Sequence, residues 1–162
     1  MLAAKLNATR SGLDLVEIEE PRPAAGECLI EVAACGICAS DLRFLAGKGE
    51  AMPGTTLGHE ATGTVVACGE GVEPDLQGRA VAIDPLVGCG DCPTCAAGLA
   101  NRCPDRGFLG IHRDGSFAER VVAPAANLVP LPDGVDLFSA ALTEPLSVAR
   151  HALGPEQAAS VA

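Results

Sequence analysis

The stretch Cys89-Gly90-Asp91-Cys92-Pro93-Thr94-Cys95, closed by Cys103, decides how the chain folds around it. It places four thiols at steps of three, three and eight residues, in a run rich in glycine and proline that breaks helices and strands. Two thiolates of a Cys-x-x-Cys turn can reach one metal ion, and tetrahedral coordination by sulfur alone suits Zn²⁺. Because four thiolates leave no position open for a substrate, we interpret these four cysteines, called here the four-cysteine lobe, as a structural zinc site. Two disulfides and an iron–sulfur cluster are the alternatives.

Composition restricts the classes of protein to which the chain can belong. Its 162 residues suffice for one domain with a buried core, and 48% of them are hydrophobic. With only four Phe and no Tyr or Trp, that core must consist mainly of aliphatic side chains. The net charge of −10 argues against nucleic acid or an anionic membrane as a partner.

The cysteines and the N-terminal residues indicate the cellular compartment of the protein. Met1–Arg10 lacks the long apolar core of a signal peptide, and no apolar run approaches the length that spans a membrane. Eight cysteines without a secretion signal indicate a reducing compartment, in which thiols bind metals. We therefore expect a cytoplasmic protein.

The hydrophobic pattern predicts a mainly β domain with a few short helices. Strands are predicted at residues 2–9, 13–19, 28–34, 57–68, 80–84, 117–123 and 127–130. One short helix is predicted to end at residue 45, and a second to run from a cap at Asp136 to residue 142. A third is predicted over residues 145–153, where Pro145 suits a first helical turn.

A second group of potential metal ligands is dispersed along the chain. Cys38, the pair His59-Glu60, and Glu144 supply the three ligand types of a catalytic zinc, which keeps one position open for water or substrate. One thiolate and one carboxylate would also neutralise Zn²⁺. From spacing alone two other interpretations stay open: His59 as a structural hydrogen-bonding residue, and Cys35-x-x-Cys38 as a redox pair.

Several segments together resemble the zinc-dependent medium-chain alcohol dehydrogenases. They are Cys35–Asp41, Gly58–Glu60, the four-cysteine lobe, Gly115–Glu119 and Thr143–Leu146. The Glu-Pro-Leu sequence of the last segment is similar to the sorbitol-type, threonine and idonate branch of that family. The resemblance covers almost the whole chain and implies that residues 1–162 form a GroES-like catalytic domain, a partly open β-barrel.

The resemblance also implies roles for single residues. It makes Cys38, His59 and Glu144 ligands of a catalytic zinc, with Glu60 as a nearby carboxylate able to move onto the metal during exchange. Ser40 would donate to the substrate oxygen, and Asp41 would orient the His59 ring. A second, structural zinc would lie among Cys89, Cys92, Cys95 and Cys103.

The implied reaction is the NAD(P)-linked oxidation of a secondary alcohol or sugar alcohol to a ketone, in which zinc acidifies the alcohol. One residue departs from the family pattern. Arg43 stands where many relatives carry a histidine that passes the proton outward, and arginine is a poor relay because it stays protonated. A water chain or another group would replace the relay, or Arg43 contacts an anionic substrate or a cofactor phosphate.

The chain is about half as long as a usual member of this family. No Gly-x-Gly-x-x-Gly sequence follows a strand and opens a helix, so we expect the nicotinamide-binding domain to lie outside this chain. NAD or NADP would then bind only with that domain, and the isolated chain would be inactive. A homo-oligomer is a further expectation. The alternative is a stand-alone zinc-binding interaction module, or a pseudoenzyme, without dehydrogenase activity.

Overall fold

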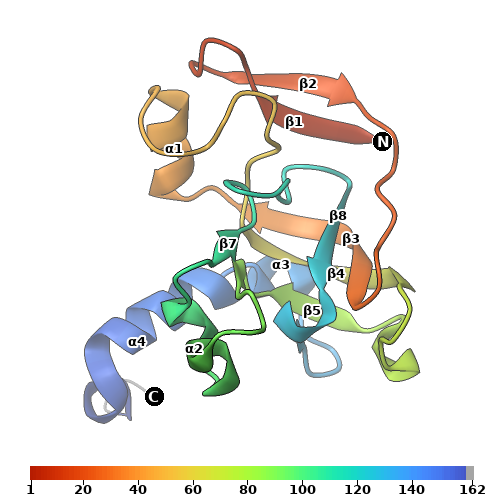
Figure 1. The fold of residues 1–162 in the computed structure, drawn as a ribbon, viewed down its shortest axis with the longest axis vertical. Coiled ribbons are helices and arrows are strands. Elements are labelled where there is room, and N and C mark those ends of the chain that lie inside the picture. Colours follow the sequence, from red (N-terminus) through yellow and green to blue (C-terminus); the bar gives the residue numbers. More distant parts are fainter. Residues whose placement is uncertain (160–162) are drawn as a thin grey trace.

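A computed structural model describes the backbone of residues 1–159 and the side chains of residues 1–154, arranged around one five-stranded antiparallel sheet (Figure 1). The strand order is β8-β3-β4-β5-β9. The bounds are Glu27–Gly36 for β3, Glu60–Cys68 for β4, Ala80–Ile83 for β5, Arg120–Pro124 for β8 and Leu128–Pro130 for β9. Among the described residues the edge strands β8 and β9 do not pair with each other, so the sheet is open.

Two short ribbons and several short helices complete the fold. Strands β1 (Leu2–Leu6) and β2 (Leu13–Glu17) form one antiparallel pair, and β6 (Leu86–Val87) and β7 (Gly107–Phe108) form the other. The α-helices are α1 (Ala39–Leu45), α2 (Pro93–Ala96), α3 (Leu137–Ala140) and α4 (Thr143–Ala159). Three 3₁₀ turns lie at Pro74–Leu76, Ala100–Arg102 and Ala125–Asn127. Figure 1 shows the β1–β2 pair at one end of the molecule and α4 at the other.

The mainly β architecture with few short helices confirms the expectation from the sequence. The strand predicted from residue 117 begins only at Arg120, because residues 117–119 bond instead to β1, where the Ala4 amide donates to the Phe117 carbonyl at 2.7 Å. Strands β6 and β7 were not predicted, since they have only two residues each. Helix α2 was not predicted either, because its four residues lie in a run rich in glycine and proline. The helix predicted to end at residue 153 kinks at Gly154, which has a φ of 73°, and continues to Ala159.

The core lies against both faces of the large sheet. Register pairs Ile30 with Val65 on β4 and with Val121 on β8, so these three buried side chains share one face, where Leu109 joins them. The opposite face is covered by α3, and the Thr62 hydroxyl donates to the Leu137 carbonyl at 2.6 Å. Strands covered on both faces become continuously apolar, which explains the buried Cys-Leu-Ile run of β3.

A second, smaller core ties α1 to the N-terminal ribbon. Leu6 of β1 packs with Phe44 of α1 and with Leu57, which lies just before β4. Full burial of each such side chain contributes roughly 1.5–3 kcal/mol. This core therefore holds α1 against the segment that leads into β4.

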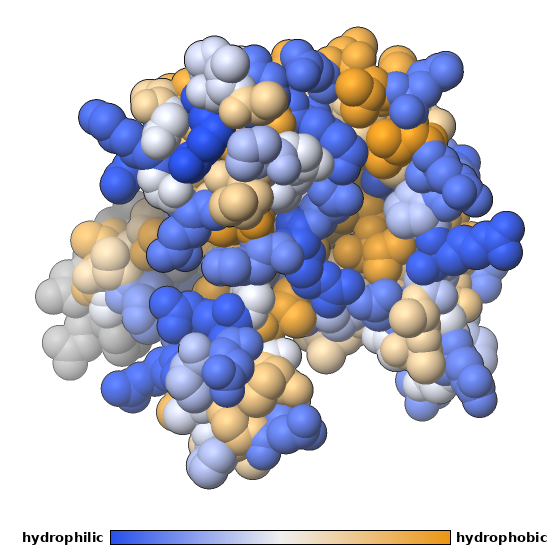
Figure 2. All heavy atoms as spheres, turned by 45° about the horizontal axis from the view of Figure 1, so that its top comes forward, coloured by the Kyte–Doolittle hydropathy of each residue, from blue (hydrophilic) through white to orange (hydrophobic). Residues whose placement is uncertain are grey.

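The surface is predominantly polar on the face shown in Figure 2, where hydrophobic side chains gather in separate patches. Exposed apolar residues include Phe138 at 78% and Leu146 at 63% relative exposure, on α3 and α4. Among the described residues, no helix combines the length and the apolar character needed to cross a membrane.

Candidate active site

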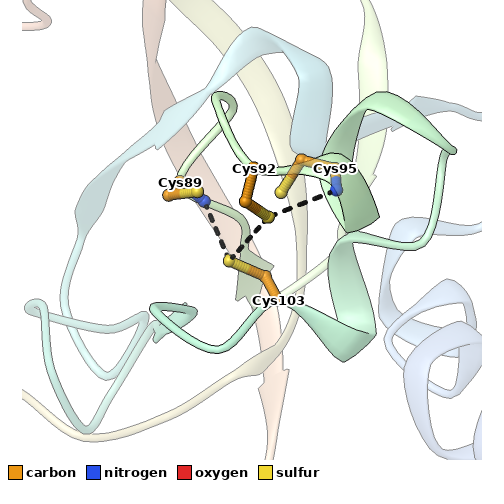
Figure 3. Close-up of side chains that lie close together, drawn as sticks. All are labelled: Cys89, Cys92, Cys95 and Cys103. Atoms are coloured by element: carbon orange, nitrogen blue, oxygen red, sulfur yellow. Dashed lines mark hydrogen bonds between the residues drawn. The ribbon is translucent and has the colours of Figure 1, made fainter.

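The four-cysteine lobe brings its thiols together as the spacing predicted. Cys89, Cys92, Cys95 and Cys103 each offer a sulfur, and the four sulfurs lie within 4.8 Å of one another. Figure 3 shows the four side chains directed toward a common centre. The Cys95 amide donates to the Cys92 sulfur at 3.4 Å, and the Cys89 amide donates to the Cys103 sulfur at 3.5 Å. Amide hydrogen bonds to sulfur favour thiolates, which are the form that binds metal.

The thiols of the lobe differ in ionisation: the pKa of Cys92 is lowered, whereas hydrogen bonds with neighbouring thiols raise the pKa of Cys89, and burial together with such hydrogen bonds raises that of Cys95 to about 11. A hydrogen bond with the Thr94 hydroxyl, 2.8 Å from the Cys92 sulfur, is the main cause that lowers the pKa of Cys92 to about 6. Thr94 was not among the predicted site residues, although a hydroxyl two residues after Cys92 can reach its sulfur within the same turn. All eight cysteines of the chain lie in the described part of the structure and are free thiols.

A second cluster forms where β3 ends and β4 begins. Antiparallel register places Gly36 opposite Glu60, and α1 starts directly after Cys38. As a result Cys38, His59 and Glu60 each offer a ligand atom within 4.8 Å of the others. A Cβ on Gly36 would lie 2.3 Å from the Glu60 carboxylate, so glycine is required for this carboxylate to lie over the end of β3. The structure thus brings together three of the residues predicted for the catalytic site.

The orientation of His59 depends on the residue before it. Gly58 has a φ of 91°, a left-handed conformation that favours glycine, and a Cβ there would lie 2.4 Å from the Phe117 ring. His59 itself is buried, and its ring packs edge-on against Phe108, with 5.1 Å between ring centroids. Phe108 was not predicted as a site residue, because nothing in its local sequence connects it with His59.

Asp41 lies beside His59 and is almost completely buried, with 1% of its surface exposed. One carboxylate oxygen accepts a hydrogen bond from the Cys38 amide at 2.9 Å. The other oxygen lies 3.7 Å from His59 Nδ1, and neither of these two buried atoms has a hydrogen-bond partner. Burial raises the pKa of Asp41, while the Cys38 amide and the nearby His59 ring oppose that rise. The carboxylate therefore lies beside the imidazole, on the side of its Nδ1 atom.

Glu144, at the start of α4, is near the cluster but is not part of it. It lines a cavity of about 490 Å³ together with Asp84, Leu86, Asn101, Ser147, Val148 and other residues. Burial raises the pKa of Glu144, and the positive potential of His59 opposes this rise, while Glu60 and Asp84 add to it. The Glu144 carboxylate does not join the group of ligand atoms that lie within 4.8 Å of one another.

Ser40 and Cys35 lie outside the cluster of Cys38, His59 and Glu60. Ser40 lines a separate cavity with Arg43, and no hydrogen bond joins the Ser40 hydroxyl to Cys38, His59 or Glu60 in the described part of the chain. Cys35 lies on β3, where burial raises its pKa to about 12. A thiol with such a high pKa is a poor redox nucleophile, which disfavours a Cys35–Cys38 redox pair.

Comparison with known proteins identifies the family of the chain. The profile of the alcohol dehydrogenase GroES-like domain matches residues 24–133. Among curated proteins, the sorbitol dehydrogenase of Halalkalibacterium halodurans is 41% identical over 138 residues, which are 85% of this chain and 40% of that enzyme. The chain therefore spans less than half the length of that curated relative.

Two solved structures are similar in fold as well as in sequence. The alcohol dehydrogenase RspB of Escherichia coli, solved with the cofactor NADH, is 38% identical with a TM-score of 0.85, covering 92% of this chain and 43% of that one. Galactitol-1-phosphate dehydrogenase of Escherichia coli is 35% identical with a TM-score of 0.86, covering 94% and 44%. The chain therefore belongs to the zinc-dependent medium-chain alcohol dehydrogenase family, of which it carries the GroES-like domain.

Proposed function

We propose that this chain is the catalytic domain of a zinc-dependent, NAD(P)-linked dehydrogenase that oxidises a secondary alcohol or sugar alcohol to a ketone. The observation that carries the proposal is the convergence of Cys38, His59 and Glu60 at the end of β3, with Asp41 buried behind the imidazole. The relatives support the substrate class, since one is a sorbitol dehydrogenase and another a galactitol-1-phosphate dehydrogenase.

The residues of this cluster fit a zinc ion. His59 Nδ1 is buried without a hydrogen-bond partner and faces an equally unpartnered oxygen of Asp41. A proton on Nδ1, held by that carboxylate, leaves Nε2 as the free ligand nitrogen. Cys38 would supply a thiolate and Glu144 or Glu60 a carboxylate, so that two negative ligands would balance the metal charge. When bound there, zinc would act as a Lewis acid toward an alcohol oxygen.

The other residues would bind and position the substrate. Ser40, two residues after Cys38, would relay the proton of the alcohol, with its own hydroxyl proton passing to water as it takes the proton of the substrate. Phe108 would close one side of the imidazole and exclude water from it. The four-cysteine lobe would hold a second zinc with a purely structural role, because its four sulfurs fill a tetrahedral site.

Metal analysis of single-site variants tests this proposal. Protein expressed with zinc should contain two zinc ions per chain by elemental analysis. Cys38→Ser and Cys92→Ser make the same substitution in the two clusters, and each should lower the content to about one. Retention of two zinc ions in Cys38→Ser, or a single zinc in the wild-type chain that is lost with Cys92→Ser, would eliminate the catalytic site. The chain would then be a zinc-binding module without dehydrogenase chemistry.

A further inference from the structure

Two adjoining cavities lie beside the candidate active site. One has a volume of about 250 Å³ and is lined by Ser40, Arg43, Phe44, Gly49, Glu50 and Ile111. The other has a volume of about 330 Å³ and is lined by Glu50, Pro104, Arg106, Phe108, Ile111 and His112. Because Glu50 and Ile111 line both, we treat the two cavities together and call them the α1 recess.

The α1 recess borders the proposed metal site on two sides. Ser40 follows Cys38 by two residues at the start of α1. Phe108, on the wall of the second cavity, packs its ring against the His59 ring at 5.1 Å. The recess therefore lies next to Cys38 and His59, with Ser40 and Phe108 between it and these two residues.

The walls of the recess carry basic groups, although the chain as a whole has a net charge of −10. Arg43 has no ion pair and no side-chain hydrogen bond within the described residues, and its guanidinium is exposed. Arg106 donates only one hydrogen bond, from Nη1 to the Cys103 carbonyl at 3.4 Å, so its other N–H groups are free. Two arginines with unused donors thus line the two adjoining cavities, one in each.

One acidic side chain also lies here. The Glu50 carboxylate is 81% exposed and lies 3.5 Å from Nε2 of His112, so it is at the rim of the recess. It does not neutralise Arg43 or Arg106 by direct contact. The recess therefore keeps an unpaired positive charge.

The chemistry of the arginine side chain identifies the ligand. A guanidinium is always charged, and its planar N–H groups match the two oxygens of a carboxylate or phosphate. Arg43 follows Ser40 by three residues on α1, so the two share a helix face, with Cβ atoms about 5–6 Å apart. We propose that the α1 recess binds the anionic end, carboxylate or phosphate, of the alcohol substrate, with Arg43 and Arg106 as its partners. This inference rests on the proposed function and adds a substrate class to it.

Binding measurements on the 162-residue chain test the proposal. Titration calorimetry would compare a hexonate, a hexitol phosphate and a neutral hexitol, each added to the zinc-loaded chain. We expect the anionic ligands to bind at least about 10-fold more tightly than the neutral hexitol, since hydrogen bonds between charged groups are the strong ones. The anion that shows this advantage, hexonate or hexitol phosphate, identifies which group the substrate carries.

Substitutions of single arginines show which residues of the α1 recess bind the anion. Arg43→Gln and Arg106→Gln should each weaken binding of the anionic ligand about 10-fold. Arg43→Lys should weaken it less, because lysine keeps the charge but lacks the planar guanidinium that binds two oxygens at once. Arg22→Gln makes the same change at an exposed arginine between β2 and β3, and it should leave the affinity unchanged. Equal binding of neutral and anionic hexitols, or an anion affinity unaffected by both glutamine variants, would overturn the proposal.

Two further measurements distinguish a substrate site from a cofactor site and from the metal site. If NAD or ADP binds the wild-type chain measurably, and Arg43→Gln weakens that binding more than the binding of the sugar anions, the recess serves a cofactor phosphate and the proposal is wrong. The Cys38→Ser variant should still bind the anion, because the arginines do not depend on the metal at Cys38. A chain that binds the anion but holds no zinc at Cys38 would contradict the dehydrogenase proposal while leaving the anion site in place.

Discussion

At the scale of single residues, Asp41 connects the helix cap with the proposed metal ligand. One of its oxygens accepts from the Cys38 amide, and the other faces His59 Nδ1 at 3.7 Å. A buried carboxylate in that place can hold the imidazole in the tautomer that exposes Nε2. We therefore propose that Asp41 orients a metal ligand and does not touch the substrate.

Asp41→Asn should test this role, since asparagine keeps the size of the side chain and its acceptor oxygen but removes the charge. We expect the affinity of the site at Cys38 and His59 for zinc to fall about 10- to 100-fold, with the zinc of the four-cysteine lobe retained. Competition with a chromophoric chelator measures both affinities. Asp136→Asn is the matched control, because Asp136 also caps a helix through the Ser139 amide but lies at α3. Equal effects of the two substitutions would mean that Asp41 serves only as a cap.

At the scale of elements, the entry into β4 depends on Gly58. Its φ of 91° is strained for any other residue, and a Cβ would come within 2.4 Å of the Phe117 ring. Gly58→Ala should therefore lower the free energy of unfolding by about 2–4 kcal/mol, from backbone strain and overpacking together. Gly26→Ala has a similar φ of 76° with no atom within 4 Å of the added Cβ, so it should cost only about 1 kcal/mol. Urea unfolding of both variants measures the difference, and similar losses would show that the contact with Phe117 relaxes freely.

The four-cysteine lobe is an element whose folding should depend on its metal. Cys95→Ser removes one of four sulfurs, and because zinc binding is coupled to folding we expect the melting temperature to fall by roughly 10 °C or more. Glu144→Ala should leave the melting temperature nearly unchanged while it weakens zinc binding at Cys38 and His59. Cys68→Ser, outside the lobe, measures the cost of the same substitution without a metal. Equal losses in Cys95→Ser and Glu144→Ala would indicate that Glu144 stabilises α4 and is no ligand.

At the scale of the whole molecule, the chain has the proposed metal sites but no dinucleotide-binding sequence. It contains no Gly-x-Gly-x-x-Gly motif, and its net charge of −10 would repel the phosphates of NAD or NADP. We therefore expect a folded, zinc-loaded domain with negligible affinity for either cofactor and no measurable oxidation of polyols. Titration calorimetry and an absorbance assay with a panel of polyols measure both. Saturable turnover by the 162-residue chain, abolished by Cys38→Ser, would contradict this expectation.

Much of the fold could be predicted from the sequence, because the signals are local. Alternating apolar residues marked the β1–β2 pair, and Asp136 marked the start of α3. The four-cysteine lobe was also predictable, since its ligands lie within 15 consecutive residues and the turns between them set their directions. Strands β6 and β7 have only two residues each, which are too few to produce a pattern.

The sequence by itself therefore determined the mainly β character of this protein, its short helices and the grouping of the four sulfurs, all of which follow from neighbours along the chain. Only the tertiary structure decided that Cys38 meets His59 and Glu60, because the antiparallel register of β3 and β4 brings together residues about 20 positions apart. It also decided that Phe108 packs on His59 and that Arg43 and Arg106 border one recess. No local pattern encodes these contacts, since each depends on how separate elements pack around the sheet.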